Sequence, residues 1–281
     1  MKSLGKVSGV SLPPWLLPTT RQNDAEAQGK RWAVRLRRAR RLLLCLDFDG
    51  TLVPIQDHPD QVWPTKRLHQ LLAQLSASGD LVVAVLSGRA LSDLRKRLDL
   101  PGIVYSGNHG LEIQGPGWSH VEPLAAQRAP ALAELGRRLD RALSACPGCW
   151  VEDKGLTLCV HYRRASPAAW SEVERIVAEV CQEHHDWLTL RAGKRTWDLF
   201  PGPALGKGTA VSRLLQRHAG KDVLGLAIGD DTTDEDMFQV LEDGLTVRVG
   251  ENQGTAARYC LPGPAEVHEF LSWLAHWRAN R

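Results

Sequence analysis

The sequence predicts an α/β protein with a doubly wound parallel sheet and an inserted α+β domain. Short apolar segments have the composition of strands that are buried on both faces, and polar or glycine-rich residues follow each of them. These segments are Leu42–Leu46, Leu81–Leu86, Ile103–Tyr105 and Val223–Ile228. Helical spacing lies between them, as in Leu68, Leu71, Leu72 and Leu75. Alternating strands and helices predict a doubly wound sheet, in which ligands bind beyond the carboxyl ends of the strands.

Composition excludes several classes of partner. The hydrophobic share of 43% and the charged share of 24% are ordinary for a soluble globular protein, and a net charge of +3 is too small to predict nucleic acid as a partner. We expect no membrane span, because no run approaches the roughly 18 apolar residues that one needs. Pro13, Pro14 and Pro18 interrupt the N-terminal apolar stretch, so we expect no signal peptide. Six scattered cysteines suit reduced thiols and predict a cytoplasmic location.

The N-terminal extension is expected to span residues 1–40. Residues 1–29 are rich in proline and small polar residues, which predicts a flexible segment. A basic stretch from Lys30 to Arg41 follows, with Trp32 and Leu36 spaced as on one face of a helix. A solvated helix that leads into the first strand is favoured over one that binds a membrane or nucleic acid.

We expect a catalytic core made of residues 41–113 and 200–281, with a cap inserted at 114–199. Within the insertion, helical patterns near Ala125–Ser144 and Ala168–His184 alternate with short strand candidates. The strand candidates are Trp150–Asp153, Leu156–His161, Trp187–Arg191 and Thr196–Leu199. An insertion that covers the carboxyl edge of the sheet would close over a site there.

Two carboxylates follow the first buried segment, in Asp47-Phe48-Asp49-Gly50-Thr51. A strand end holds Asp47 rigidly, as a nucleophile requires, and Asp49 follows in a turn that glycine permits. From there Asp49 could protonate a leaving group and later activate water. The simpler alternative is a turn that only ends the strand.

A second acidic cluster runs from Gly229 to Asp236, after another buried strand. If Asp47 attacks a phosphate dianion, two negative charges approach to about 3 Å, and their repulsion is roughly 5 kcal/mol per charge pair at an effective dielectric near 20. A cation must offset this repulsion, so a second acidic cluster that binds one is expected. Asp230 and Asp231 offer the hard oxygen ligands that Mg²⁺ prefers. An EF-hand is excluded by its spacing, whereas Thr233 and Asp236 have the spacing of a capping box.

Two further strand-to-helix turns offer contacts for a phosphate. Ser87 and Gly88 precede a helix whose N-terminus could hold a phosphoryl oxygen. Lys207 offers a positive charge to the same group. The sequence around it is not a Walker A motif, because Gly208 stands where that motif has Ser or Thr.

Taken in order, the Asp-x-Asp-Gly-Thr motif, the serine, the lysine and Gly-Asp-Asp resemble the haloacid dehalogenase superfamily of phosphatases. Finer features over about residues 42–272 resemble its trehalose-6-phosphate phosphatase family. They are Gly107 to Glu112, Val151 to Gly155, His161 to Arg163, Lys207-Gly208 and Gly229 to Phe238.

The resemblance implies a phospho-aspartyl intermediate on Asp47, acid and base catalysis by Asp49, and Mg²⁺ as cofactor. The metal ligands would be Asp47, Asp49 through its backbone carbonyl, Asp230 and Asp231. Ser87, Gly88 and Lys207 would bind the phosphate. The implied contacts to the sugar phosphate are Asn108, His109, Glu152, Lys154, Arg163, Lys194 and Asp198.

Three positions depart from the family pattern and leave the substrate open. The family usually has Glu at Asp198, Arg or Lys at Phe200, and Ser at Asn108. Trehalose 6-phosphate is the expected substrate. The alternatives are another glycosyl phosphate, such as glucosylglycerol phosphate, or an inactive domain that binds sugar phosphate and regulates a partner. The sequence does not predict an oligomeric state.

A zinc site is a further alternative in the insertion. Cys146 and Cys149 are closely spaced, and Cys159 and His161 follow them. Because no second pair stands at a familiar interval, free thiols are favoured.

Overall fold

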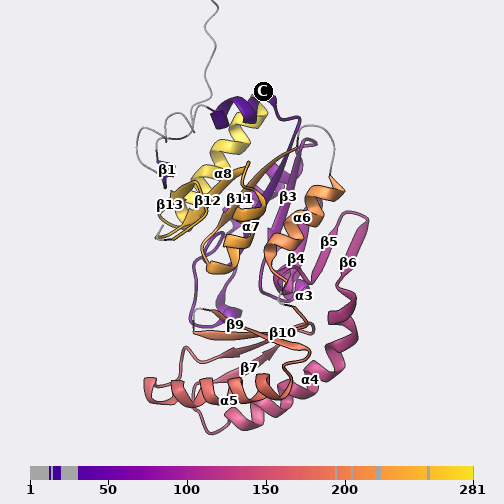
Figure 1. Ribbon diagram of the computed structural model, residues 1–281. Helices are drawn as coiled ribbons and strands as arrows, with labels where there is room; N and C mark the ends of the chain where they lie inside the picture. Colours follow the sequence, from indigo (N-terminus) through magenta and orange to yellow (C-terminus); the bar gives the residue numbers. More distant parts are fainter. Residues whose placement is uncertain are drawn as a thin grey trace, which may run out of the picture.

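The computed structural model describes residues 13, 15–19, 31–193, 195–203, 205–218, 223–251 and 254–280. Two sheets organise these residues. One forms a core, and the other forms a smaller cap that lies below the core in Figure 1.

The core sheet has nine strands in the order β1-β13-β12-β11-β2-β3-β4-β5-β6. Its six central strands, from β13 to β4, are parallel, whereas β1, β5 and β6 pair antiparallel at the two edges. The bounds are β1 Leu17–Pro18, β2 Arg41–Asp47, β3 Leu81–Leu86, β4 Val104–Gly107, β5 Glu112–Gly115, β6 Trp118–Val121, β11 Val223–Gly229, β12 Leu245–Val249 and β13 Tyr259–Leu261. The predicted doubly wound α/β core is confirmed.

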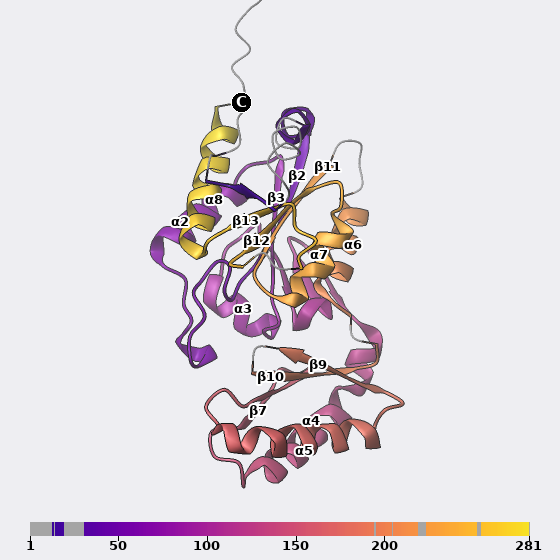
Figure 2. The same cartoon turned by 60° about the vertical axis from the view of Figure 1, so that its left-hand side comes forward.

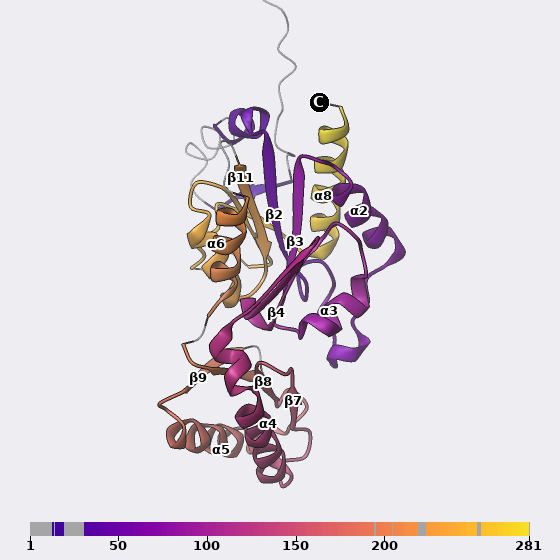
Figure 3. The ribbon, with the colours of Figure 1, turned by 90° about the vertical axis from the view of Figure 1, so that its right-hand side faces the viewer.

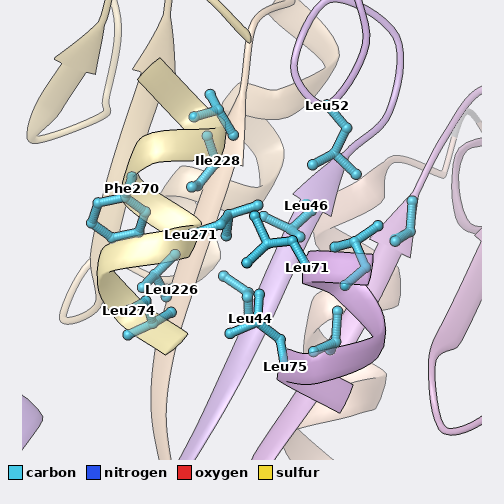
Figure 4. Close-up of a cluster of buried hydrophobic side chains, with 14 of the residues drawn as sticks. Leu44, Leu46, Leu52, Leu71, Leu75, Leu226, Ile228, Phe270, Leu271 and Leu274 are labelled. Atoms are coloured by element: carbon cyan, nitrogen blue, oxygen red, sulfur yellow. The ribbon is translucent and has the colours of Figure 1, made fainter. Parts of the chain in front are cut away.

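Helices cover both faces of this sheet, as the edge-on view in Figure 3 shows. On one face lie α2 (Lys66–Ser76), α3 (Leu91–Leu98) and α8 (Pro264–Ala279), and on the other lie α6 (Lys207–Arg217) and α7 (Glu235–Val240). Alternate residues of each strand point to opposite faces, so β2 and β11 contribute to both apolar cores. Figure 4 shows Leu44 and Leu46 of β2 packed between α2 and α8.

The cap has four antiparallel strands in the order β7-β8-β10-β9. The bounds are α4 Pro123–Leu143, β7 Trp150–Asp153, β8 Leu158–His161, α5 Trp170–Glu183, β9 Leu188–Gly193 and β10 Thr196–Pro201. One face of this sheet, with Leu158, Val160 and Leu199, packs on α4 and α5. Figure 2 shows the sheet between these helices and the core, so its other face is turned toward the carboxyl ends of the core strands.

The predicted domain limits differ from the structure at the start of the cap. The hairpin of β5 and β6 extends the core sheet by antiparallel pairing. The cap elements therefore begin at Pro123 rather than at residue 114, and they end with β10 at Pro201.

The predicted N-terminal extension is partly packed onto the core. Within residues 1–29, the structure describes 13 and 15–19, where β1 pairs with β13 and Trp15 contacts Phe270 edge-on. Residues 31–38 form a helix that buries Trp32 and Leu36 in the core. The prediction of a flexible segment over 1–29 is therefore wrong for residues 15–19. Residues 1–12, 14 and 20–29 lie outside the described residues. Among the described helices, none combines the length and apolar character that a membrane crossing requires.

Candidate active site

A cavity of about 200 Å³ lies between the carboxyl ends of the core strands and the cap sheet. The core contributes side chains from the ends of β2, β3, β4 and β11 and from the start of α6. The cap contributes the polar face of its sheet. The lining includes Asp47, Asp49, Ser87, Gly88, Arg89, His109, Trp150, Glu152, Lys154, Cys159, His161, Arg163, Asp198, Lys207, Asp230 and Asp231.

Asp47 is the last residue of β2, and only one of its two carboxylate oxygens accepts a hydrogen bond from the described residues. Its Oδ1 accepts a hydrogen bond from Lys207 Nζ at 2.5 Å, and the same ammonium donates to Asp234 Oδ1 at 2.6 Å. Its Oδ2 is buried and has no hydrogen-bond partner among the described residues. Burial raises the pKa of Asp47 well above its usual range; Asp234 and Asp230 add to this rise, and Lys207 opposes it. A cation beside Oδ2 would favour the carboxylate form.

Three buried carboxylates form a candidate metal site. Oxygen atoms of Asp47, Asp230 and Asp234 lie within 4.8 Å of one another. They carry more negative charge than the single ammonium of Lys207 offsets, and all are hard oxygen ligands. The unpartnered oxygen of Asp47 and this donor set fit a divalent cation.

The turn at Gly50 is built around Asp230. Gly50 has φ of +89°, and a Cβ there would lie 2.3–2.5 Å from the carboxylate atoms of Asp230. Thr51 Oγ1 also donates to Asp230 Oδ1 at 3.3 Å. The glycine after Asp49 therefore lets the two acidic strand ends approach each other.

We expect Gly50→Ala to displace Asp230 and weaken binding of a divalent cation at least about tenfold, as loss of a supporting residue does at other metal sites. Left-handed strain adds a loss of about 1–2 kcal/mol in the free energy of unfolding. Calorimetric titration with Mg²⁺ and chemical denaturation measure the two effects. Gly117→Ala is the matched control, because Gly117 has φ of +75° and a Cβ added there would meet nothing within 4 Å. Equal metal affinity in both variants would contradict this role of Gly50.

Arg89 holds the second carboxylate of the first motif. Its Nε and Nη2 donate to the two oxygens of Asp49, each at 2.7 Å, and its Nη1 donates to Asp93 at 2.8 Å. A bidentate pair of this kind fixes the orientation of the Asp49 carboxylate in the cavity.

His109 faces the cavity on a strained segment. Asn108 and His109 both have left-handed backbone, with φ of +48° and +56°. A Cβ on Gly88 would lie 2.5 Å from the His109 ring, so Gly88 makes room for that ring. Both ring nitrogens of His109 are buried without a hydrogen-bond partner among the described residues. Burial lowers the pKa of His109, with Lys154 and Lys207 adding and Asp198 opposing, so the ring is neutral at neutral pH.

The cap presents paired charges to the cavity. Lys154 Nζ lies 3.3 Å from Asp198 Oδ1, and both side chains are buried. Burial opposes the charge of each. Lys154 and His109 nevertheless lower the pKa of Asp198, and Cys159, Asp198 and Glu152 raise the pKa of Lys154. Glu152 Oε2 accepts a hydrogen bond from His161 Nε2 at 2.7 Å. Burial acts to raise the pKa of Glu152, but His161 and Lys154 lower it overall. These paired polar side chains line the cavity and could contact a polar ligand there.

The sequence model of the family described as trehalose-phosphatase matches residues 45–262. This chain belongs to the trehalose-phosphatase family. A trehalose-phosphate phosphatase of Mycobacterium marinum is 35% identical over 238 residues, which are 82% of this chain and 60% of that protein. The chain thus spans about 60% of the length of this curated relative.

Two solved structures place the fold. The C-terminal domain of Candida albicans trehalose-6-phosphate phosphatase matches with a TM-score of 0.75 and 25% identity, over 93% of this chain and 99% of that one. A haloacid dehalogenase-like hydrolase from Bacteroides thetaiotaomicron matches in fold, with a TM-score of 0.60 and 18% identity over 83% of this chain and 99% of that one. The core is therefore a haloacid dehalogenase-like fold, as the sequence resemblance implied.

In this trehalose-phosphatase family member, most residues singled out from the sequence meet at one cavity. Asn108 does not line this cavity, and the prediction for Lys194 is not tested. The amide of Asn108 donates to Glu112 and to the Lys154 carbonyl, and it accepts from Thr157, so it ties the core to the cap. Lys194 lies outside the described residues.

Asp231 lines the cavity, but its carboxylate accepts from the Thr232 backbone N–H and starts a short helical turn. Asp234 completes this capping box, because its Oδ2 accepts from the Asp231 N–H at 2.9 Å. The capping pair is therefore Asp231 and Asp234, not Thr233 and Asp236. Asp234 takes the place of Asp231 beside Asp47 and Asp230.

Sequence reasoning missed the roles of Asp234 and Arg89. Asp234 stands four residues after Asp230 in the acidic stretch, and Arg89 directly follows Ser87-Gly88, so each lies within a motif that carries predicted site residues. Phe200 stands where the family usually has Arg or Lys. It is fully buried and contacts His109 edge-on, so it supports that ring.

Proposed function

We propose that this chain is a magnesium-dependent phosphatase that hydrolyses trehalose 6-phosphate to trehalose and phosphate. The observation that carries the proposal is the buried, unpartnered Oδ2 of Asp47, at the foot of a cavity whose cap side is lined by charged side chains. The trehalose-phosphate phosphatase names of the relatives supply the choice of sugar.

The proposed reaction has two steps. Oδ2 of Asp47 attacks phosphorus, the bond from phosphorus to the sugar oxygen breaks, and that oxygen takes a proton from Asp49. Water then attacks phosphorus, gives its proton to Asp49, and the bond between phosphorus and Asp47 breaks. Lys207 and Ser87 hold the phosphoryl oxygens. Because Arg89 pairs with the Asp49 carboxylate, Asp49 would have to leave Arg89 and take up a proton from water before the first step.

Asp47, Asp230 and the backbone carbonyl of Asp49 are the proposed ligands of Mg²⁺. Both carboxylate oxygens of the neighbouring Asp234 already accept hydrogen bonds, one from Lys207 and one from the Asp231 N–H. The bound cation would offset the repulsion between Asp47 and the phosphate. The cap residues Glu152, Lys154, Arg163 and Asp198 would then read the sugar hydroxyls, and His109 would contact the substrate between cap and core.

Phosphate release from a panel of sugar phosphates tests the proposal. We expect kcat/KM for trehalose 6-phosphate to exceed that for glucose 6-phosphate at least about tenfold, or about 1.4 kcal/mol, because the second ring adds contacts to the cap. EDTA should abolish release and Mg²⁺ restore it. A higher kcat/KM for glucosylglycerol phosphate would overturn the choice of sugar. No release from any sugar phosphate would favour the inactive regulatory domain.

A further inference from the structure

The polar face of the cap sheet brings together three side chains of different ligand types. In the pairing of β7 with β8, Glu152 lies directly opposite Cys159, and His161 follows two residues later on the same face. A carboxylate oxygen, the thiol sulfur and a ring nitrogen of the three residues lie within 4.8 Å of one another. The Glu152 oxygen and His161 Nε2 are 2.7 Å apart.

We propose that Glu152, Cys159 and His161 form a second metal site, for a cation that accepts sulfur and nitrogen ligands, such as Zn²⁺. Zn²⁺ binds Cys at about 2.3 Å, and His and Glu at about 2.0–2.2 Å. Around a tetrahedral centre these bonds put ligand atoms about 3.3–3.6 Å apart, so small side-chain shifts close the site. Three protein ligands leave a fourth position open toward the cavity.

The ligand types separate this site from the aspartate cluster. Asp47, Asp230 and Asp234 offer oxygen alone, which suits Mg²⁺, whereas a thiolate and an imidazole favour Zn²⁺ over Mg²⁺. The two clusters therefore select different cations within one cavity.

The surroundings constrain two of the three ligands, His161 by stacking and Cys159 by burial. The His161 ring stacks on Trp150, with centroids 4.5 Å apart and planes 6° from parallel. Cys159 is buried, with 2% of its surface exposed. Lys154 brings a positive charge near the site, but its pairing with Asp198 offsets it, and the thiolate and Glu152 carboxylate would balance a divalent cation.

This site differs from the zinc alternative considered from the sequence. Cys146 belongs to the apolar cluster beneath the cap helices, and Cys149 packs against that cluster. Strand β8 alternates, so Leu158 and Val160 point into that cluster while Cys159 and His161 point away from it. The four residues grouped from their spacing therefore do not form one site, and Glu152 replaces the two other cysteines.

Zn²⁺ bound at this site would hold Glu152, which could then no longer contact the sugar. We therefore expect Zn²⁺ to inhibit phosphate release. This consequence, unlike the site itself, rests on the proposed function. Inhibition would need no change in fold, because the ligands line the cavity in place.

Cobalt titration of the whole chain, with Mg²⁺ in excess to hold the aspartate cluster, tests the site without turnover. Co²⁺ bound to a thiolate shows a strong charge-transfer absorption in the near ultraviolet, which oxygen ligands do not produce. We expect this band to saturate at one equivalent, to disappear in Cys159→Ser and to persist in the matched control Cys149→Ser. No such band in the native protein, or an unchanged band in Cys159→Ser, would overturn the site.

Zinc inhibition of phosphate release, with each variant measured against its own zinc-free rate, tests the consequence. We expect Cys159→Ser to need at least about tenfold more Zn²⁺ for half-inhibition than the native protein and Cys149→Ser. Equal inhibition of all three would refute the inhibitory role while the cobalt band still supported the site. If no sugar phosphate is hydrolysed at all, the proposed function fails and the cobalt result stands by itself.

Discussion

Asp47→Asn is expected to lower phosphate release from trehalose 6-phosphate at least about 10⁴-fold, as loss of a nucleophile does in other covalent mechanisms. The substitution keeps the shape of the side chain but replaces an oxygen with an amide nitrogen that cannot attack phosphorus. It also removes one charge from the cluster with Asp230 and Asp234, so the affinity for Mg²⁺ should fall. Phosphate release at saturating substrate and Mg²⁺ measures the effect.

Stability should not fall with activity. The pKa of Asp47 is raised by burial, so its ionised form costs free energy in the folded state at neutral pH. A neutral amide removes that cost, and we expect Tm to stay the same or rise, as when a strained catalytic group is removed from other enzymes.

Asp57→Asn is the matched control. Asp57 lines the same cavity but is exposed, so the same change of charge and shape should alter the rate by less than a few-fold. Turnover by Asp47→Asn within tenfold of the native rate would exclude Asp47 as the nucleophile, whatever the substrate.

The sequence predicts the core of the site well because parallel strands fix where their ends lie. Asp47 ends β2, Ser87 follows β3, and Asp230 follows β11. In the sheet, β2 lies between β11 and β3, so three motifs far apart in the sequence must meet at one edge. Apolar runs alone were enough to place these strands.

The features that the sequence did not predict depend on contacts between side chains of different helices, strands and loops. Arg89 and Asp49 lie on different strand ends, and the choice of Asp234 over Asp231 beside Asp47 depends on which carboxylate starts the short helical turn. The spacing of Asn108 gives no sign that its amide joins the core to the cap. Likewise, the sequence pattern of the β5–β6 hairpin resembles that of the insertion, but β5 pairs with β4 and so belongs to the core sheet.

Lys207→Met is expected to destabilise the fold by about 3–5 kcal/mol and to lower phosphate release at least about 10³-fold. Lys207 is 3% exposed and neutralises both Asp47 and Asp234, so the nearly isosteric methionine leaves buried carboxylates without their counter-charge. Removal of one partner from a buried ion pair typically costs this much. The loss of the proposed phosphate ligand and of an ordered proposed nucleophile would account for the lower rate. Chemical denaturation in metal-free buffer and phosphate release measure the two effects.

The pH dependence of the loss distinguishes this charge mechanism from a packing defect. In the native protein Asp234 and Asp47 outweigh burial and raise the pKa of Lys207, so its contribution is complete below the unfolded lysine pKa of about 10.4 and is lost only at strongly alkaline pH. In the variant, the unpaired carboxylates gain protons more readily when folded than when unfolded, so stability should rise as pH falls. The difference in unfolding free energy between native protein and variant should therefore be smaller at pH 5 than at pH 8.

A second substitution tests the pairing directly. Asp234→Asn in the Lys207→Met background removes one of the repelling charges, so it should restore part of the lost stability although Asp234→Asn alone destabilises the native protein. Lys96→Met is the control for loss of a lysine charge at an exposed helical position, where we expect a change within about 0.5 kcal/mol. Two outcomes would show that Lys207 does not hold the two carboxylates by charge. One is a loss of less than about 1 kcal/mol in the free energy of unfolding of Lys207→Met, and the other is a further loss when Asp234→Asn is added to that variant. Its place beside Asp47 would then reflect packing alone.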